Sequence, residues 1–293
     1  MDTALAVDVG GTKMAAGLVT AEGEVITSAT AASRADDAEG LFSVLLALVD
    51  AVGGHGGVAG SPASGVAVCG VGCGGPMTPG GEAVSPLNIA VWRDFPLRSR
   101  LAEATGLATF VDNDAKALAL GEGWRGAAAG CENFIAMVVS TGVGGGIVLD
   151  GRLLDGAKGN AGHIGHVCVE PQGRRCACGA RGCLEAEASG TSIAAITGRP
   201  AAEAGPEVVA RVGRLVGRAV ASVANLCDLT LAVVAGSVAL GYGEPFFAAA
   251  QAELDAQARL SFSRGARIVP AGLGPAGPLV GAAAVGWRGL GRL

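Results

Sequence analysis

Residues 6–19, AVDVGGTKMAAGLV, place a glycine turn between two runs of small and β-branched residues, a pattern typical of two buried strands. Gly10 and Gly11 lack a Cβ, so the backbone N–H groups of this turn can approach an anion closely. Residues 138–151, VVSTGVGGGIVLDG, repeat the order of strand, polar residue, glycine turn and strand. Two such hairpins in two halves of one chain can clamp a polyphosphate between two lobes. Two ordinary tight hairpins are the alternative interpretation.

Outward from these hairpins, apolar runs typical of strands alternate with segments of helical periodicity, which indicates an α/β fold. Strands are expected within residues 5–10, 14–20, 24–30, 64–72, 108–115, 133–154 and 229–237. Helices are expected within residues 36–52, 94–106, 116–126, 207–228, 244–260 and 278–290. In the second helix, Asp94 is expected to cap the start and Gly106 to end it.

Composition excludes several classes of protein. The chain has 293 residues, of which half are apolar and 16% are charged, as expected for one or two compact domains. The net charge of −5, without a cluster of Lys and Arg, argues against nucleic-acid binding. No uninterrupted apolar run is long enough for a membrane span, and the N-terminus does not resemble a signal peptide. We therefore expect a cytoplasmic protein whose eight cysteines are thiols or metal ligands.

The two glycine turns supply the candidate phosphate-binding residues. They are Gly10, Gly11 and Thr12 in the first turn, and Thr141, Gly142, Gly144 and Gly145 in the second. Neither turn matches the Walker A pattern, and the second is a poor dinucleotide fingerprint because a strand follows it. Asp8, at the end of the first strand, is placed to hold Mg²⁺ through water, because Mg²⁺ keeps much of its hydration.

A second carboxylate candidate lies in VDNDA, residues 111–115, where a strand is expected to meet a helix. Asp114 can accept the proton of a hydroxyl nucleophile, as a catalytic aspartate does in phosphoryl transfer. Asn113 can both donate to and accept from sugar hydroxyls. The alternative is that Asp114 only caps the helix.

One imidazole and three thiols follow in the spacing H-x9-C-x-C-x4-C. They belong to His166, Cys176, Cys178 and Cys183. This donor set makes a closed tetrahedral site for a structural Zn²⁺. The surrounding loop is rich in Gly and Arg and has few large apolar residues, so a metal would help to fold it. Reduced, buried cysteines are the alternative.

These motifs together resemble a known family. DVGGTK (8–13), VDNDA (111–115), STGVGGGI (140–147), GHIGH (162–166) and CACGARGCLE (176–185) follow the order seen in ROK-family sugar kinases. The resemblance spans about residues 5–285. It implies the two-lobed actin/hexokinase-like (ribonuclease H-like) ATPase fold, with an active-site cleft between the lobes. The expected domains are a small α/β lobe, 1–113, completed by the C-terminal helix at 278–293, and a larger α/β lobe, 114–277, with the zinc-binding loop.

The resemblance also implies an activity and roles for individual residues. ATP with Mg²⁺ is the implied donor, the 6-hydroxyl of a small-molecule sugar is the implied acceptor, and a homodimer or dimer of dimers is the implied assembly. Asp114 matches the catalytic base. The implied sugar-binding residues are Asn88 of the SPLNIAVW lid segment, Asn113, Asp114, His163, His166 and Glu185. The implied nucleotide and Mg²⁺ residues are Asp8, Gly10, Gly11, Thr12, Lys13, Thr141, Gly142, Gly144, Gly145 and Gly236.

Two positions depart from the family's common pattern. His163 stands where most of these kinases have glutamate, and AGHIGH resembles the N-acetylmannosamine kinases of the family. A neutral histidine offers one donor, which suits the carbonyl of a 2-acetamido group. The resemblance therefore implies a hexose or an N-acylhexosamine as the sugar, with N-acetylmannosamine and glucose as candidates. Lys116 stands where Asn or Gln is more usual, and the sequence assigns it no role.

Other functions and another donor remain open from the sequence. A non-catalytic sugar sensor would not need Asp8 and Asp114, which are both present. In a transcriptional regulator of this family, a helix-turn-helix would precede a motif that here begins at residue 8. Polyphosphate remains an alternative donor to ATP.

Overall fold

A computed structural model describes residues 2–53 and 65–293. The chain divides into two compact units, which are described separately. Unit 1 comprises Met1–Gly126, Asp155–Asn160 and Leu273–Leu293, and unit 2 comprises Ala127–Leu154 and Ala161–Gly272. Residues 114–126 and 155–160 thus pack with unit 1, whereas the expected boundary lies at residue 113. The boundaries of the functional lobes remain a prediction.

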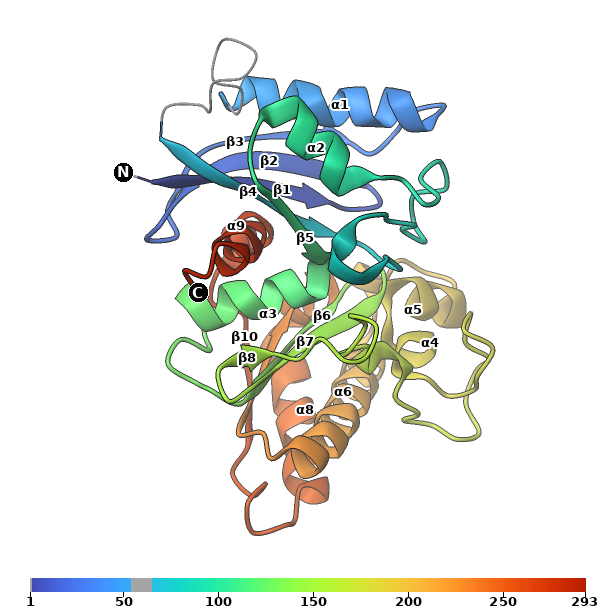
Figure 1. Cartoon of the computed structure of the whole chain (residues 1–293). Helices are drawn as coiled ribbons and strands as arrows, with labels where there is room; N and C mark the ends of the chain where they lie inside the picture. The colour runs from blue at the N-terminus through green and yellow to red at the C-terminus, as the bar shows by residue number, and fades with distance from the viewer. Residues whose placement is uncertain (1, 54–64) are drawn as a thin grey trace. The chain divides into compact units, whose positions relative to one another are not determined.

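Unit 1 is built on a five-stranded sheet of order β3-β2-β1-β4-β5. Its strands are β1 (Thr3–Val9), β2 (Lys13–Thr20), β3 (Val25–Ala32), β4 (Val66–Cys73) and β5 (Thr109–Asn113). β1, β4 and β5 run parallel, and β1–β2 and β2–β3 are antiparallel. Helices α1 (Ala38–Ala51) and α2 (Leu97–Thr105) cover one face, and α3 (Asp114–Arg125) and α9 (Gly277–Gly289) cover the other (Figure 1).

The residues of β1 alternate between two cores, as the period of a strand requires. Leu5 and Val7 pack in the core with α1, and Ala4 and Ala6 pack against α9. The residues on the α9 side are small because this helix lies very close to the sheet. A Cβ added to Gly70 of β4 would lie 2.0 Å from the Ala282 carbonyl oxygen, so only glycine fits there.

The helix ends in unit 1 test the predicted caps. Asp37 caps α1 by accepting a 2.7 Å hydrogen bond from the Gly40 N–H. Gly106 ends α2 with φ of 70°, as predicted. The prediction that Asp94 caps this helix is wrong. The helix begins at Leu97, and Asp94, with φ of 49°, accepts a hydrogen bond from Ser85.

Unit 2 contains a second five-stranded sheet, of order β10-β9-β6-β7-β8. Its strands are β6 (Phe134–Val139), β7 (Val143–Leu149), β8 (Arg152–Leu153), β9 (Leu231–Ala235) and β10 (Arg267–Pro270). Helices α6 (Pro206–Cys227) and α8 (Glu244–Gln257) lie side by side (Figure 1). They approach closely because Gly217 faces α8, where an added Cβ would lie 2.2 Å from the Ala250 carbonyl oxygen.

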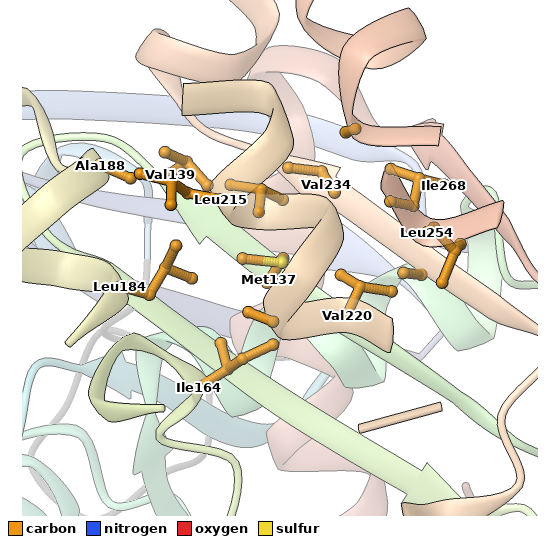
Figure 2. Packing of buried hydrophobic residues seen from close by; sticks show 14 of the residues in the cluster. Met137, Val139, Ile164, Leu184, Ala188, Leu215, Val220, Val234, Leu254 and Ile268 are labelled. Atoms are coloured by element: carbon orange, nitrogen blue, oxygen red, sulfur yellow. The ribbon is translucent and has the colours of Figure 1, made fainter. Parts of the chain in front are cut away.

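The core of unit 2 extends from the sheet to the loop that carries the histidines and cysteines. In Figure 2, Met137 of β6 lies among Leu215 and Val220 of α6. Ile164 and Leu184, which flank the loop in sequence, belong to the same cluster. Both ends of the loop are therefore fixed by apolar packing.

The remaining elements of the described chain are short. They are α4 (Leu184–Ala188), α5 (Gly190–Thr197), α7 (Ser237–Tyr242) and the 3₁₀ turns η1 (Pro79–Gly81), η2 (Ile164–His166), η3 (Ala201–Glu203) and η4 (Gly274–Ala276). The sequence pattern did not predict these elements or β10. Within residues 2–53 and 65–293, none of the helices has the length and apolar character needed to cross a membrane.

Candidate active site and metal centre

The candidate site of unit 1 lies at the carboxyl ends of its three parallel strands. β1, β4 and β5 end at neighbouring positions, and their register places Asp8 beside Gly72 and Gly72 beside Asp112. A Cβ added to Gly72 would lie 3.8 Å from Asp8 Oδ1 and 3.7 Å from Asp114 Cα. Strand pairing thus brings together two aspartates that are far apart in sequence, at the sheet edge where α/β folds bind ligands.

Burial and charge act together on this carboxylate pair. Burial raises the pKa of Asp8 to about 7, the negative charge of Asp114 acts in the same direction, and Lys13 opposes the shift. Burial and the two carboxylates also raise the pKa of Cys73 well above its usual value, so this thiol stays protonated. A bound cation would offset the cost of keeping both aspartates ionised.

Asn113 and Asp114 share the start of α3. Asn113 is the N-cap, and its Oδ1 accepts a 3.1 Å hydrogen bond from the Ala115 N–H. Asp114 Oδ1 accepts from the same N–H at 2.8 Å. The helix N-terminus favours a negative charge at Asp114. Because Asn113 occupies the cap position, capping alone does not account for Asp114.

The first glycine turn contacts the predicted lid segment. The Gly10 N–H donates to the Lys13 carbonyl at 3.1 Å, and Ser33 Oγ donates to the Gly10 carbonyl at 2.6 Å. A Cβ added to Gly11 would lie 2.4 Å from the Asn88 Cβ, so glycine is required for this contact. Unit 1 thus gathers the turn that contains Thr12 beside Asn88, and Asn113 and Asp114 at the end of the neighbouring strands.

In unit 2, the second glycine turn is held by polar contacts from two helix starts. The Gly190 N–H donates to the Ser140 carbonyl at 2.7 Å, and Thr191 Oγ1 donates to the Thr141 carbonyl at 3.0 Å. Ser140 Oγ lies 2.9 Å from Ser237 Oγ. Thr191 and Ser237 were not predicted as site residues, although each is a hydroxyl residue that directly follows a glycine at the start of a helix.

Gly236 lies beside this turn, where the backbone packs too closely to leave space for a side chain. Its φ is 99°, and an added Cβ would lie 2.3 Å from the Val139 carbonyl oxygen. Strand pairing of β6 with β9 brings Gly236 next to the turn that holds Thr141, Gly142, Gly144 and Gly145. The predicted nucleotide-side residues of unit 2 therefore lie close together.

The four predicted metal ligands form one cluster. Their ligand atoms, from His166, Cys176, Cys178 and Cys183, all lie within 4.8 Å of one another. Cys176 Sγ is 3.7 Å from His166 Nδ1, and Cys178 Sγ is 3.7 Å from Cys183 Sγ. Three thiols and one imidazole at these distances fit a tetrahedral Zn²⁺ ion.

The helix that follows the cluster connects the loop with the second glycine turn. Glu185, two residues after Cys183, accepts a 2.9 Å hydrogen bond from the Val143 N–H through Oε2. A Cβ added to Gly142 would lie 2.9 Å from the same oxygen. The rings of His163 and His166 lie 6.1 Å apart. Folding of the loop thus determines where both histidines and Glu185 lie.

A buried carboxylate supports this loop and was missed by the sequence analysis. Glu187, 2% exposed, accepts a 2.6 Å hydrogen bond from the Arg174 N–H and pairs with Arg211 of α6 at 2.5 Å. It ties the loop to the core of unit 2, and its GCLEAE context gave no sign of this role.

These features first identify the fold to which the protein belongs. Two α/β units, each with a glycine turn at the edge of a five-stranded sheet, form the actin/hexokinase-like fold. The sequence profile of the ROK family matches residues 4–287, and the chain belongs to this family.

Two curated relatives differ in the sugar that their names state. The glucokinase of Halalkalibacterium halodurans is 41% identical over 194 residues, which are 65% of this chain and 57% of that protein. The N-acetylmannosamine kinase of Escherichia fergusonii is 36% identical over 258 residues, which are 82% of this chain and 85% of that protein.

Solved structures of the same fold cover almost the whole chain. A ROK hexokinase from Thermus thermophilus is 30% identical with a TM-score of 0.81, covering 99% of this chain and 100% of that chain. A ROK family glucokinase from Streptomyces griseus, in complex with glucose and AMPPNP, is 29% identical with a TM-score of 0.81, covering 98% and 99%. A ROK family transcriptional regulator, a homolog of the E. coli MLC protein, also reaches 0.81 at 25% identity, covering 97% and 77%.

Proposed function

We propose that this protein is an ATP- and Mg²⁺-dependent kinase that phosphorylates the 6-hydroxyl of a hexose or an N-acylhexosamine. The observation that carries the proposal is the pairing of Asp8 and Asp114 at one sheet edge, because this chemistry needs a cation-binding carboxylate and a base. The named activities of the curated relatives and the glucose and AMPPNP complex of the S. griseus enzyme support it.

In the proposed reaction, Asp114 accepts the proton of the sugar 6-hydroxyl as its oxygen attacks the γ-phosphorus of ATP. The new P–O bond forms to the sugar, and the bond between the γ-phosphorus and the bridging oxygen to the β-phosphate breaks, releasing ADP. The proposed sugar ligands are Asn88, Asn113, His163, His166 and Glu185. We also propose that the two units correspond to the two lobes of the fold.

The nucleotide would be held by the two glycine turns. Their backbone N–H groups suit phosphate oxygens, and Lys13 adds a positive charge. Gly236 lets the start of α7 pack directly against the backbone of Val139, beside the second turn. Asp8 would hold Mg²⁺, which neutralises phosphate charge when bound. The Cys₃His cluster would hold Zn²⁺, which fixes the loop that presents His163 and His166.

The histidine at position 163 favours N-acetylmannosamine over glucose as the proposed substrate. Its position follows Gly162 and immediately precedes η2, whose last residue is the proposed sugar ligand His166. A ring N–H at His163 can donate to an acetamide carbonyl, which an ionised glutamate cannot do. Glucose remains the second candidate.

The competing functions are a sugar sensor and a transcriptional regulator. The equal TM-scores of the glucokinase and the regulator show that the fold does not distinguish these functions. Intact carboxylates and glycine turns favour the kinase. The homodimer or dimer of dimers, the cytoplasmic location and the absence of nucleic-acid binding remain predictions.

A sugar panel tests the proposal. The protein is incubated with Mg²⁺ and either ATP or polyphosphate, and with glucose, mannose, N-acetylglucosamine or N-acetylmannosamine in turn. We expect sugar-dependent ADP formation from ATP and a phosphate on O6 by NMR. Sugar binding without phosphate transfer would contradict the kinase and support a sensor, and transfer from polyphosphate alone would contradict ATP as donor.

A further inference from the structure

Lys116 is almost completely buried, although its side chain is charged. Its side chain is 4% exposed, and Nζ lies 2.8 Å from Asp112 Oδ1, 2.8 Å from Asp155 Oδ1 and 3.3 Å from the Gly159 carbonyl oxygen. The ammonium group donates hydrogen bonds to Asp155 and Gly159 and forms an ion pair with Asp112. Burial of the charge is therefore compensated by two carboxylates and one carbonyl.

Arg288 of α9 completes a charge quartet with these residues. It lies 2.8 Å from Asp155 and 3.4 Å from Asp112. Although burial acts to raise it, hydrogen bonds from Lys116 and Arg288 lower the pKa of Asp155 below its usual value. The quartet of Asp112, Lys116, Asp155 and Arg288 thus joins the junction of β5 and α3, the segment 155–160 and α9, all within unit 1.

The quartet brackets the proposed base along the chain. Asp112 lies two residues before Asp114, and Lys116 lies two residues after it. Asp112 Oδ1 accepts a 2.8 Å hydrogen bond from the Asn113 N–H and forms an ion pair with the Lys116 ammonium. These contacts of Asp112 therefore link the end of β5 to the first turn of α3, on both sides of Asn113 and Asp114.

Through Asp155, Lys116 also holds segment 155–160 in place. Segment 155–160 belongs to unit 1, but residues of unit 2 precede and follow it in sequence. His163 comes three residues after the segment ends. Lys116 is thus bonded both to the strand that leads into the base and to the segment that leads into a proposed sugar ligand.

We propose that Lys116 is a positioning residue for phosphoryl transfer, whose ammonium holds Asp112 and Asp155 together and thereby fixes Asn113 and Asp114 at the start of α3. The inference rests on the proposed kinase function. It assigns no contact between Lys116 and the substrate.

A pocket beside the quartet makes a chemical-rescue test possible. The pocket has a volume of about 540 Å³ and is lined by all four charged residues of the quartet, together with Gly156 to Gly159. A small amine can therefore reach the space that truncation of Lys116 would open. The three acceptor atoms around that space would bind a primary ammonium ion.

The experiment compares wild type with Lys116→Ala, with and without propylammonium, and uses the sugar that wild type phosphorylates best. We expect kcat of the variant to fall about tenfold or more, because a misplaced base loses rate, while KM for ATP stays within about threefold. Propylammonium should raise the variant's kcat about fivefold or more, because it restores N–H donors to the acceptors. Tetramethylammonium, which has no N–H donor, should not.

Two further variants separate positioning from general stability. Arg100→Met removes a bidentate ion pair with Glu39, which joins α2 to α1 in the same unit and includes no residue of the quartet, and should lower Tm without changing kcat. Lys116→Met combined with Asp155→Asn removes one charge of each sign, so folding should persist while kcat stays about tenfold low.

The outcomes separate this inference from the proposed function. No sugar phosphorylation by wild type would overturn both. Normal wild-type activity with an unchanged kcat in both Lys116 variants would overturn the positioning role alone. A lowered kcat that propylammonium and tetramethylammonium affect equally would also overturn it, because the ammonium hydrogen bonds would then not be the cause.

Discussion

Two regions of the molecule are held in place by different interactions. They are the carboxylate edge of unit 1, which carries Asp8 and Asp114, and the cysteine loop of unit 2, which carries Cys176, Cys178 and Cys183. Strand register places Asp8 beside Gly72, and Asp114 lies close to the same glycine. The strands that position them are hydrogen-bonded along their length. The loop, which the structure describes throughout, has no paired strands, and its backbone hydrogen bonds belong to turns and to isolated bridges, such as Cys168 with Cys183 and Arg175 with Arg181. The edge is therefore held by continuous strand pairing, whereas the loop combines local backbone hydrogen bonds with contacts of its side chains.

The two regions also differ in the size of their buried apolar clusters. The cysteine loop contributes a small apolar cluster of Cys176, Cys183 and Ala186, far smaller than the core beneath the sheet of unit 1. Between its packed ends the loop has little hydrophobic stabilisation of its own, so a bound metal would supply part of its folding free energy. Damage to the loop should therefore affect sugar binding, and damage to the edge should affect turnover.

The largest effect is expected at the edge. Asp114→Asn keeps the size of the side chain but removes the base, so kcat should fall about 10²-fold or more, the usual contribution of a positioned base. Initial rates of ADP formation at saturating sugar measure it. Turnover close to wild type would show that Asp114 is not the base.

A smaller effect is expected when the loop loses its metal. Cys178→Ser removes one thiolate ligand, so zinc should drop well below one ion per chain and sugar affinity should weaken about 10- to 100-fold. Metal analysis and calorimetric sugar titration measure these changes. Cys168→Ser is the matched control, because Cys168 lies in the same loop but outside the cluster. Equal losses in both variants would argue against a specific metal site.

Within the loop, His163→Glu should change the choice of sugar. An acetamide carbonyl facing a carboxylate loses a hydrogen bond and meets repulsion, while a 2-hydroxyl can donate to it. The ratio of kcat/KM for N-acetylmannosamine to that for glucose should shift toward glucose by about tenfold. An unchanged ratio would mean that His163 does not contact the substituent at C2.

The last prediction concerns the stability of the edge and requires no change in activity. Because the pKa of Asp8 rises from 3.8 to about 7 on folding, ionised Asp8 costs stability as pH rises through this range, and the full cost applies above pH 7. Without Mg²⁺ or nucleotide, Asp8→Asn should be more stable than wild type at pH 8 by up to about 4 kcal/mol, because the shift is about three pKa units and already includes the opposing Lys13 charge. Thermal unfolding should show this difference vanish near pH 4, and a constant difference would contradict the ionisation.

The sequence predicted the elements best where hydrophobic period and end signals agree. Gly106 ends its helix because glycine adopts positive φ without cost, and α6 follows a long amphipathic pattern. Asp94 does not cap the helix because its side chain accepts a hydrogen bond from Ser85 of the lid segment. The short helices α4, α5 and α7 contain too few residues to show a period.

The candidate site was predictable where spacing itself is informative. The Cys₃His spacing identified four residues that the structure places within 4.8 Å. Glu187 and the quartet around Lys116 could not be predicted, because their partners come from distant parts of the chain. Such contacts follow from tertiary packing, which local pattern does not contain.

The most direct test of the division between edge and loop is the sugar dissociation constant of Asp114→Asn and Cys178→Ser, measured by calorimetry under the same conditions. Loss of the base should leave the constant within about threefold of wild type, because Asp114 acts mainly on the transition state. Loss of the metal ligand should weaken binding about tenfold or more. Sugar binding that fails in Asp114→Asn and persists in metal-free Cys178→Ser would contradict the account.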